Sequence, residues 1–243
     1  MRRQWPRNDV QRGAVLSREA EKPEEVVRGS LSFKAVIFDF DGTLVDSLCG
    51  IAAAMNEALG EMGLPEHTLE SYRAKVGEGV GILAKRVLPE DWPGSTKELI
   101  LRYRQHYRQR MWESVRLYEG IPALLDKLKE LKIPMAVLSN KGDEFIQLLS
   151  KGLLASWAFA DIRGERMGVP KKPDPTSALE VAQTLRVKPE ETVFVGDTLV
   201  DMQTAHAAGM RAIGVSWGFR GEEELHKAGA SFVLNAPLQL LYI

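Results

Sequence analysis

One stretch decides the fold of this chain, and it reads Ala35-Val36-Ile37-Phe38-Asp39-Phe40-Asp41-Gly42-Thr43-Leu44-Val45-Asp46-Ser47. Its four leading apolar residues are followed by charge, which indicates a strand buried on both faces. Asp39 and Asp41 come at the carboxyl end of that strand, where open α/β sheets bind their ligands. Side chains two residues apart in an extended chain point the same way, so we expect both carboxylates to face one ligand. Gly42 permits the turn that follows.

The pair of Asp39 and Asp41 indicates a cation site. Two carboxylates a few ångströms apart repel each other unless a cation or a proton joins them. Mg²⁺ suits such a pair, because it is a hard ion that prefers oxygen ligands and often binds together with phosphate. An acidic turn without a ligand is the alternative interpretation, since Asp-Gly is an ordinary turn dipeptide. The rest of the chain favours the cation site.

Composition narrows the function classes. The 243 residues suffice for one large domain or for a domain with a smaller insertion, and a hydrophobic content of 44% suits a well-buried core. A formal net charge of -1 gives no sign of a nucleic-acid-binding face. The sequence shows no apolar run of the ~20 residues that cross a bilayer, and no secretory signal. We therefore expect no nucleic-acid partner and no membrane partner.

Cysteine and histidine usage points the same way. The single cysteine, Cys49, excludes an internal disulfide and is typical of the reducing cytoplasm. We therefore expect a cytoplasmic protein in which Cys49 is a packing residue. The four histidines are scattered without the spacing of metal ligands, so we expect surface or packing roles for them.

The chain divides into three kinds of segment. Residues 1–32 mix arginines with acids and have few periodic apolar positions, which indicates a loosely ordered N-terminal extension or an incorrectly assigned start codon. The glutamates of this segment argue against a targeting peptide. Residues 47–118 show helical periodicity without a strand pattern, which predicts an inserted helical cap. Residues 33–46 and 119–243 then form the core.

The second half of the chain alternates between strand and helix patterns. Short apolar runs at residues 135–138, 192–195 and 212–215 predict strands, and helical patterns lie between them. Asp143 is expected to cap a helix over residues 144–151. This alternation predicts an α/β fold, in which a parallel sheet carries helices on both faces through right-handed crossovers.

Polar side chains follow the predicted strands. Ser139 and Asn140 come after the run at 135–138, and Asp197 comes after a later run, with Asp201 four residues further on. Between these groups, Lys172 lies in a rigid proline-containing loop. If the three groups lie along the carboxyl edge of the sheet, they form a metal site and an anion site side by side.

The motifs D-x-D-G-T, S-N, K-P and G-D-x-x-x-D, in that order over residues 34–201, resemble the signature of the haloacid dehalogenase superfamily. The resemblance implies a Rossmann-like parallel sheet with a mobile cap. The position of the helical segment between the first two motifs resembles the small helical cap type. The roughly thirty residues between Asn140 and Lys172 leave no room for the larger alternative.

The resemblance also implies catalytic roles. Asp39 would be the nucleophile that attacks phosphorus and forms an aspartyl-phosphate. Asp41 would protonate the leaving oxygen and then activate the water that hydrolyses this intermediate. Ser139 would bind the phosphoryl oxygens, and Lys172 would offset their charge and that of Asp39.

A Mg²⁺ site is implied in the same way. The carboxylates of Asp39 and Asp197 and the backbone carbonyl of Asp41 would hold the ion. Asp201 would serve as a further ligand or support the ligands from behind.

Position 41 and the cap loop bear on the type of enzyme. The dehalogenases, phosphonate hydrolases and P-type pumps of the superfamily lack an aspartate at the position of Asp41, so its presence favours phosphate-ester hydrolysis or mutase chemistry. Residues 72–79 resemble the cap of phosphoglycolate-phosphatase-type members. Arg73 would then pair with a substrate carboxylate, and a solvated helix position is the alternative for it. Further substrate contacts are expected from Gly42, Thr43, Asn140, Gly77 and Gly79.

These features predict a Mg²⁺-dependent phosphoric monoester hydrolase that acts on a small phosphorylated metabolite resembling 2-phosphoglycolate. A sugar-phosphate mutase of the same superfamily and a phospho-accepting scaffold without turnover are the alternatives. Asp41, Ser139, Lys172 and Asp197 together favour an enzyme, because a scaffold needs no acid–base group. The sequence is compatible with a monomer or a homodimer.

Overall fold

The computed structural model describes residues 32–243, so the predicted extension of residues 1–32 lies outside the described part of the chain except for Ser32. The strands are β1 (Ala35–Phe38), β2 (Val45–Asp46), β3 (Arg116–Leu117), β4 (Met135–Gly142), β5 (Phe159–Glu165), β6 (Thr192–Gly196), β7 (Arg211–Val215) and β8 (Phe232–Leu234). The α-helices are α1 (Leu48–Glu61), α2 (Leu69–Lys75), α3 (Val80–Val87), α4 (Thr96–Ser114), α5 (Ile121–Glu130), α6 (Asp143–Leu153), α7 (Thr176–Leu185), α8 (Leu199–Ala207) and α9 (Glu222–Lys227). Short 3₁₀ helices cover Pro189–Glu191 and Pro237–Tyr242.

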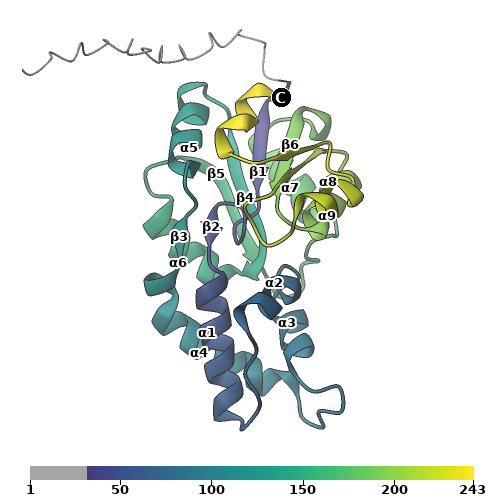
Figure 1. The fold of residues 1–243 in the computed structure, drawn as a ribbon. Coiled ribbons are helices and arrows are strands. Elements are labelled where there is room, and N and C mark those ends of the chain that lie inside the picture. Colours follow the sequence, from purple (N-terminus) through teal and green to yellow (C-terminus); the bar gives the residue numbers. More distant parts are fainter. Residues whose placement is uncertain (1–31) are drawn as a thin grey trace, which may run out of the picture. The chain divides into compact units, whose positions relative to one another are not determined.

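Six parallel strands form the central sheet, in the order β5-β4-β1-β6-β7-β8 (Figure 1). The first strand, β1, lies in the middle of the sheet. β4 and β5 follow on one side of it, and β6, β7 and β8 follow on the other side. In register, Phe38 of β1 pairs with Val137 on one side and with Val195 on the other. This doubly wound order confirms the predicted α/β fold and places a topological switch point beside β1.

Alternate residues of β1 face opposite helical layers, as expected for a strand buried on both faces. Val36 and Phe38 pack into the cluster that contains the apolar residues of α5 and α6. Ala35 and Ile37 pack into the cluster of α7, α8 and α9. All four side chains are almost completely buried, and Figure 1 shows the two helical layers on either side of the sheet.

Helices α1 to α4 lie between β2 and β3, in sequence positions predicted for a helical cap (Figure 1). β2 and β3 form a short antiparallel pair, in which Val45 lies opposite Leu117 and Asp46 opposite Arg116. The sequence pattern did not predict this pair, because two-residue strands carry no readable alternation. The boundaries of a separate cap domain remain a prediction. Within residues 32–243, no helix combines the length and the apolar character needed to cross a membrane.

Two local expectations are wrong. Asp143 is the first residue of α6 and does not cap it; its carboxylate accepts the backbone N–H of Gly164 in β5 at 2.8 Å. Asp143 therefore connects α6 to the neighbouring strand. Cys49 is exposed at the start of α1 and is not a packing residue.

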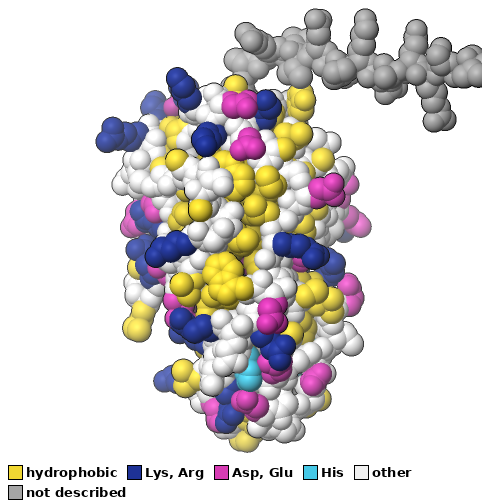
Figure 2. Space-filling model, turned by 90° about the vertical axis from the view of Figure 1, so that its left-hand side faces the viewer, with side chains coloured by type: hydrophobic (Ala, Val, Ile, Leu, Met, Phe, Trp, Pro, Cys, Tyr) yellow, Lys and Arg dark blue, Asp and Glu magenta, His cyan; other side chains and the backbone are white. Residues whose placement is uncertain are grey.

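Charged side chains on α4 pair with acidic neighbours. Arg102 lies 2.9 Å from Glu61 and 2.8 Å from Glu98, and His106 lies 3.0 Å from Glu57. On the face shown in Figure 2, basic and acidic side chains are interspersed. The arginine content of α4 is therefore largely matched by carboxylates.

Candidate active site

The switch point brings two loops together at the carboxyl edge of the sheet. Asp39 follows β1 directly, and Asp197 follows the adjacent strand β6. Asp201 lies in the first turn of α8, the helix that continues from β6. Adjacent parallel strands end at the same edge, which is why residues about 160 positions apart in sequence meet here.

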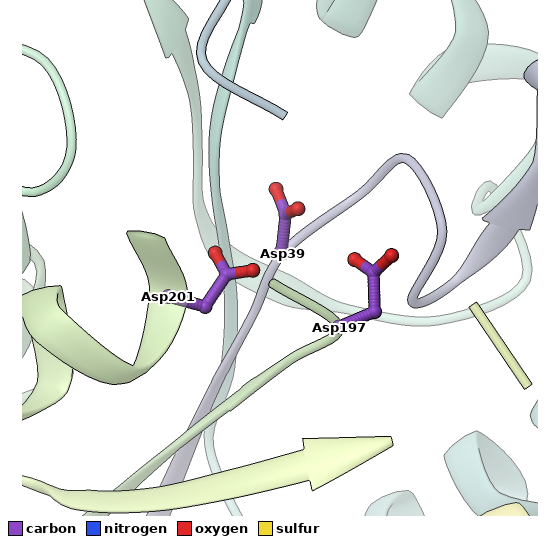
Figure 3. Close-up of side chains that lie close together, drawn as sticks. All are labelled: Asp39, Asp197 and Asp201. Atoms are coloured by element: carbon purple, nitrogen blue, oxygen red, sulfur yellow. The ribbon is translucent and has the colours of Figure 1, made fainter. Parts of the chain in front are cut away.

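Asp39, Asp197 and Asp201 form a buried acidic cluster (Figure 3). One carboxylate oxygen from each lies within 4.8 Å of the others. Lys172 joins them: its Nζ lies 2.8 Å from Asp39 Oδ1 and 2.6 Å from Asp201 Oδ1. One ammonium group contacts two of the three carboxylates, so the cluster retains negative charge in a buried place.

The pKa values of the acidic cluster reflect its burial and its excess of negative charge. Burial raises the pKa of Asp39 to about 6, although the neighbouring Lys172 acts to lower it. Burial, with the charges of Asp201 and Asp39, also raises the pKa of Asp197 well above its ordinary value. Buried oxygen donors that carry uncompensated negative charge suit a hard divalent cation such as Mg²⁺. The donor set therefore fits the predicted metal.

Backbone and hydroxyl groups fix the orientation of Asp197. The backbone N–H of Phe219 donates to its Oδ2 at 2.8 Å, and the hydroxyl of Thr43 donates to its Oδ1 at 3.2 Å. Gly42 lies against the same carboxylate, because a Cβ on Gly42 would be 2.6 Å from the carboxylate carbon of Asp197. Gly42 also has a φ of +84°, which favours glycine. The turn after β1 is thus shaped around Asp197.

Asp201 is held by different partners. Its Oδ2 accepts the backbone N–H of Thr198 at 3.0 Å and the hydroxyl of Thr198 at 2.7 Å, while its Oδ1 accepts Lys172. Thr198 is the residue before α8, so these bonds also satisfy the start of that helix. Both oxygens of Asp201 are therefore occupied by protein donors.

Asp41 lies outside the acidic cluster. Ser47 donates its hydroxyl to Asp41 Oδ1 at 2.6 Å, and Lys141 Nζ lies 2.9 Å from Oδ1 and 3.0 Å from Oδ2. Asp39 and Asp41 do line one cavity, as expected, but their side chains have separate partners.

A small cavity of about 50 Å³ lies over these two aspartates, between the sheet edge and the helical insertion. Ser139 and Asn140 line it from β4, and Gly77 and Gly79 line it from the loop between α2 and α3. Their contacts with substrate remain predictions. Apolar side chains complete much of the wall: Ile51, Val76, Val80, Leu83, Tyr103 and Phe145.

The other predicted residues lie elsewhere. Gly42 and Thr43 are behind the cavity against Asp197, and neither lines it. Arg73 lines a second cavity of about 550 Å³ beside Thr198 and Arg220. Its guanidinium donates to the carbonyl of Gly218 at 3.2 Å. A contact of Arg73 with substrate remains a prediction.

Sequence reasoning missed three residues of this site. Lys141 binds Asp41 and lies 4.4 Å above the ring centre of Tyr107 in α4. Its signal was its place two residues after Ser139, which puts both side chains on one side of an extended chain. Tyr103 and Arg104 line the cavity from α4. The four-residue spacing of buried Leu99, Tyr103, Tyr107 and Met111 shows that α4 turns one face inward.

Comparisons with known proteins show the family of this chain. The sequence profile of the haloacid dehalogenase-like hydrolases matches residues 36–215. A phosphoglycolate phosphatase from Pseudomonas savastanoi pv. phaseolicola is 33% identical over 224 residues, covering 90% of this chain and 82% of that protein. One from Aquifex aeolicus is 32% identical over 208 residues, covering 86% and 95%.

Solved structures show the same relationship. A haloacid dehalogenase-like hydrolase from Streptococcus pneumoniae superimposes with a TM-score of 0.78 and 27% identity, covering 87% of this chain and 98% of that one. Coverage of this extent includes both the sheet and the helical insertion described above. The chain therefore belongs to the haloacid dehalogenase-like hydrolases, and it is a phosphatase that resembles the phosphoglycolate phosphatases.

Proposed function

We propose that this protein hydrolyses a small phosphorylated metabolite through an aspartyl-phosphate on Asp39, with Mg²⁺ as its cofactor. The observation that carries the proposal is the buried cluster of Asp39, Asp197 and Asp201 around Lys172. Such a cluster is costly for a protein to keep buried, and its charge suits a site that binds a cation and a phosphoryl group together.

The carboxylate of Asp39 is the nucleophile in this proposal. An oxygen of Asp39 forms a bond to phosphorus while the bond from phosphorus to the ester oxygen breaks. Asp41 gives a proton to the leaving alcohol oxygen and then takes one from the water that attacks the aspartyl-phosphate. Inorganic phosphate leaves, and Asp39 is restored. Ser47 and Lys141 hold Asp41 in place for both proton transfers.

The remaining groups balance charge. Mg²⁺, held by the carboxylates of Asp39 and Asp197 and by the backbone carbonyl of Asp41, would neutralise the charge of the phosphoryl oxygens. Ser139 would donate to one of these oxygens from the cavity wall. Asp201, whose oxygens are already occupied, would serve mainly to position Lys172 beside Asp39.

The cavity favours a substrate of the size of 2-phosphoglycolate. Its volume of about 50 Å³ is far below the roughly 300–1,000 Å³ of sites for drug-sized ligands. Arg104 brings a cation from α4 to the cavity wall, where a carboxylate of the substrate would meet it. The related proteins from Pseudomonas and Aquifex are named phosphoglycolate phosphatases, which supports the same substrate class.

Phosphate release from a panel of esters tests the proposal. The panel pairs 2-phosphoglycolate with ethyl phosphate, which has a methyl group in place of the carboxylate, and adds a hexose phosphate. Each is measured with Mg²⁺ and with EDTA, and Asp39→Asn is the control. Metal-dependent release that is lost in Asp39→Asn is the expected result. Isomerised sugar phosphate without release would indicate a mutase, and a labelled protein without turnover would indicate a phospho-accepting scaffold.

A further inference from the structure

Three consecutive backbone carbonyls of the insertion accept hydrogen bonds from three different side chains of the sheet-bearing part. Arg220 donates to the carbonyl of Val76 at 3.0 Å, and Asn140 donates to that of Gly77 at 3.3 Å. Lys171 donates to the carbonyl of Glu78 at 2.7 Å. These three donors come from the loop after β7, from β4 and from the loop after β5. We call them the carbonyl clamp.

Each clamp residue is next to a group of the candidate active site. Asn140 follows Ser139 and lines the catalytic cavity, and Lys171 precedes Lys172. Arg220 follows Phe219, whose N–H donates to Asp197. A displacement of the loop over residues 76–79 is therefore transmitted along one peptide unit to each of these three groups.

Arg220 donates to more carbonyls of the insertion than Asn140 or Lys171 does. Besides Val76, its guanidinium donates to the carbonyls of Arg73 and Ala74, which belong to the last turn of α2. The carbonyls in the last turn of a helix lack partners within the helix and carry partial negative charge, so a cation there is favourable. Glu224 lies 3.1 Å from Arg220 Nε and fixes its other end, and the side chain is only 13% exposed.

The loop that carries Arg220 is pressed against the acidic cluster. A Cβ on Gly218 would lie 2.6 Å from Asp197 Oδ2, so the backbone itself packs on that carboxylate. The indole N–H of Trp217 donates to the carbonyl of Thr43 at 3.0 Å, in the turn after β1. Arg73 returns a bond from α2 to the carbonyl of Gly218. The segment from Trp217 to Arg220 thus contacts α2 on one side and Asp197 on the other.

We propose that Arg220 is a positioning residue of the phosphatase. By holding the end of α2 and the loop over residues 76–79, it keeps the cavity wall of the insertion in register with Asp197. It has no contact with the catalytic cavity, so it acts through the segments that it joins. The inference does not depend on which phosphate ester is the substrate.

Arg86 offers a matched control, because it makes the same kind of bond without joining the two parts. It lies in α3, donates to the carbonyl of Lys75 in the last turn of α2 at 3.0 Å and pairs with Glu78. Arg86→Gln therefore removes an arginine from the end of α2 but leaves the connection to Asp197 intact. A role limited to stabilising α2 predicts equal effects of Arg86→Gln and Arg220→Gln.

The test compares Arg220→Gln, Arg220→Lys and Arg86→Gln in the full chain. Amide hydrogen exchange, which needs no substrate, is expected to accelerate in both residues 69–79 and residues 216–219 for Arg220→Gln. In Arg86→Gln it should change in residues 69–79 alone. With an aryl phosphate as the probe, Arg220→Gln should raise KM and the Mg²⁺ concentration at half-maximal rate, by roughly tenfold, as when groups supporting metal ligands are lost. Arg220→Lys, which retains a cation, should restore part of each loss.

Equal effects of Arg220→Gln and Arg86→Gln would overturn the proposal, as would unchanged exchange over residues 216–219. If Arg220→Gln does not fold, Arg220→Lys carries the same comparison, since its shorter reach serves fewer carbonyls. An inactive parent enzyme with accelerated exchange in the variant would contradict the proposed function and leave the positioning role supported.

Discussion

Gly42 and Asp197 are packed so closely that no side chain fits between them. A Cβ at position 42 would lie 2.6 Å from the carboxylate carbon of Asp197 and 2.8 Å from its Oδ1. The segments that follow two adjacent strands supply these residues, so their contact fixes how the turn after β1 meets the start of the segment after β6. The position of the Asp197 carboxylate, a proposed metal ligand, is therefore set by backbone packing.

We expect Gly42→Ala to displace Asp197 and to lower phosphatase activity by at least about 100-fold, since small displacements in an active site have effects of that size. Gly209→Ala is the matched control. Gly209 also has a positive φ, of +69°, but open space surrounds the position of its Cβ. Both variants should lose about 1–2 kcal/mol of stability from strain at a positive φ. Gly42→Ala should lose more than Gly209→Ala, because its Cβ would meet the Asp197 carboxylate, and only Gly42→Ala should lose activity. Comparable activity of the two variants would contradict this account.

The pKa of Asp39 predicts how pH affects the metal-free protein. In the folded state it is about 6, above the ordinary value of 3.8, so folding takes up a proton between these values. Below about pH 4 the carboxyl group of Asp39 is protonated in both states and does not lower the free energy of unfolding. As the pH rises from about 4 through 6, the free energy of unfolding falls, because the buried carboxyl group must give up its proton. Asp39→Asn removes this loss of stability and leaves Lys172 paired with Asp201.

With EDTA present, we expect Asp39→Asn to be more stable than the parent near about pH 8, by on the order of 1–3 kcal/mol, and equally stable near about pH 4. Urea unfolding at the two pH values measures the difference. A variant that is less stable at the higher pH would show that the ion pair with Lys172 outweighs the burial of charge.

Asp41→Asn separates the two chemical steps of the proposed mechanism. An amide at this position cannot take a proton from the attacking water, so hydrolysis of the aspartyl-phosphate should slow by roughly 10²–10⁴-fold. With an aryl phosphate, whose leaving group needs little protonation, a burst of product followed by slow turnover is expected. Mass spectrometry of the quenched protein should then find a phosphoryl group on Asp39. A proportional loss of both phases would place the main role of Asp41 in the first step.

Arg104 is expected to select for a second anionic group on the substrate. Arg104→Gln should raise KM for 2-phosphoglycolate by roughly 10- to 100-fold, because a carboxylate would lose a charged partner, and leave ethyl phosphate almost unaffected. Arg108→Gln is a suitable control. Arg104 and Arg108 both lie in α4 and both pair with Glu144 of α6, but Arg108 does not line the cavity. Equal losses for the two esters would indicate a general effect on the cavity wall.

Arg73 is the alternative partner for the substrate carboxylate, and a variant of it separates the two possibilities. Arg73→Gln should leave the ratio of the two esters unchanged, since its guanidinium lies in the neighbouring cavity and binds the carbonyl of Gly218. A selective loss with 2-phosphoglycolate in this variant would assign the role to Arg73 and require α2 to move on substrate binding. Kinetics of both variants with both esters decide between the two arginines.

The sequence predicted the elements whose pattern is local. A four-residue apolar run predicts a buried strand, and parallel strands end at a common edge, so the sequence alone places Asp39, Ser139 and Asp197 together. The structure confirms the sheet and brings these residues to its carboxyl edge. Gly77 and Gly79, for which we predict substrate contacts, line the cavity.

The features that escaped depend on contacts between distant segments. Lys141 reaches Asp41 across 100 positions, and Arg220 reaches α2 across about 145. Neither contact leaves a periodic trace in the sequence. The first depends on the pairing of β1 with β4, and the second depends on how the insertion lies on the sheet. Arg73 shows the limit of reasoning from charge alone: its charge suggested a substrate contact, which stays a prediction, and the structure shows that its guanidinium donates from α2 to the carbonyl of Gly218.

The carbonyl clamp has a consequence for how such enzymes diversify. Its three donors bind main-chain oxygens of residues 76–78, so the bonds do not involve the side chains of Val76 and Glu78, while Gly77, with a φ of +123°, favours glycine. We therefore expect that mutations of Val76 and Glu78 can change this loop without disturbing the alignment of the proposed catalytic groups. A chimaera that receives the helical segment of a relative needs only the same backbone path at this loop. New substrate preferences can in this way evolve on an unchanged chemical apparatus.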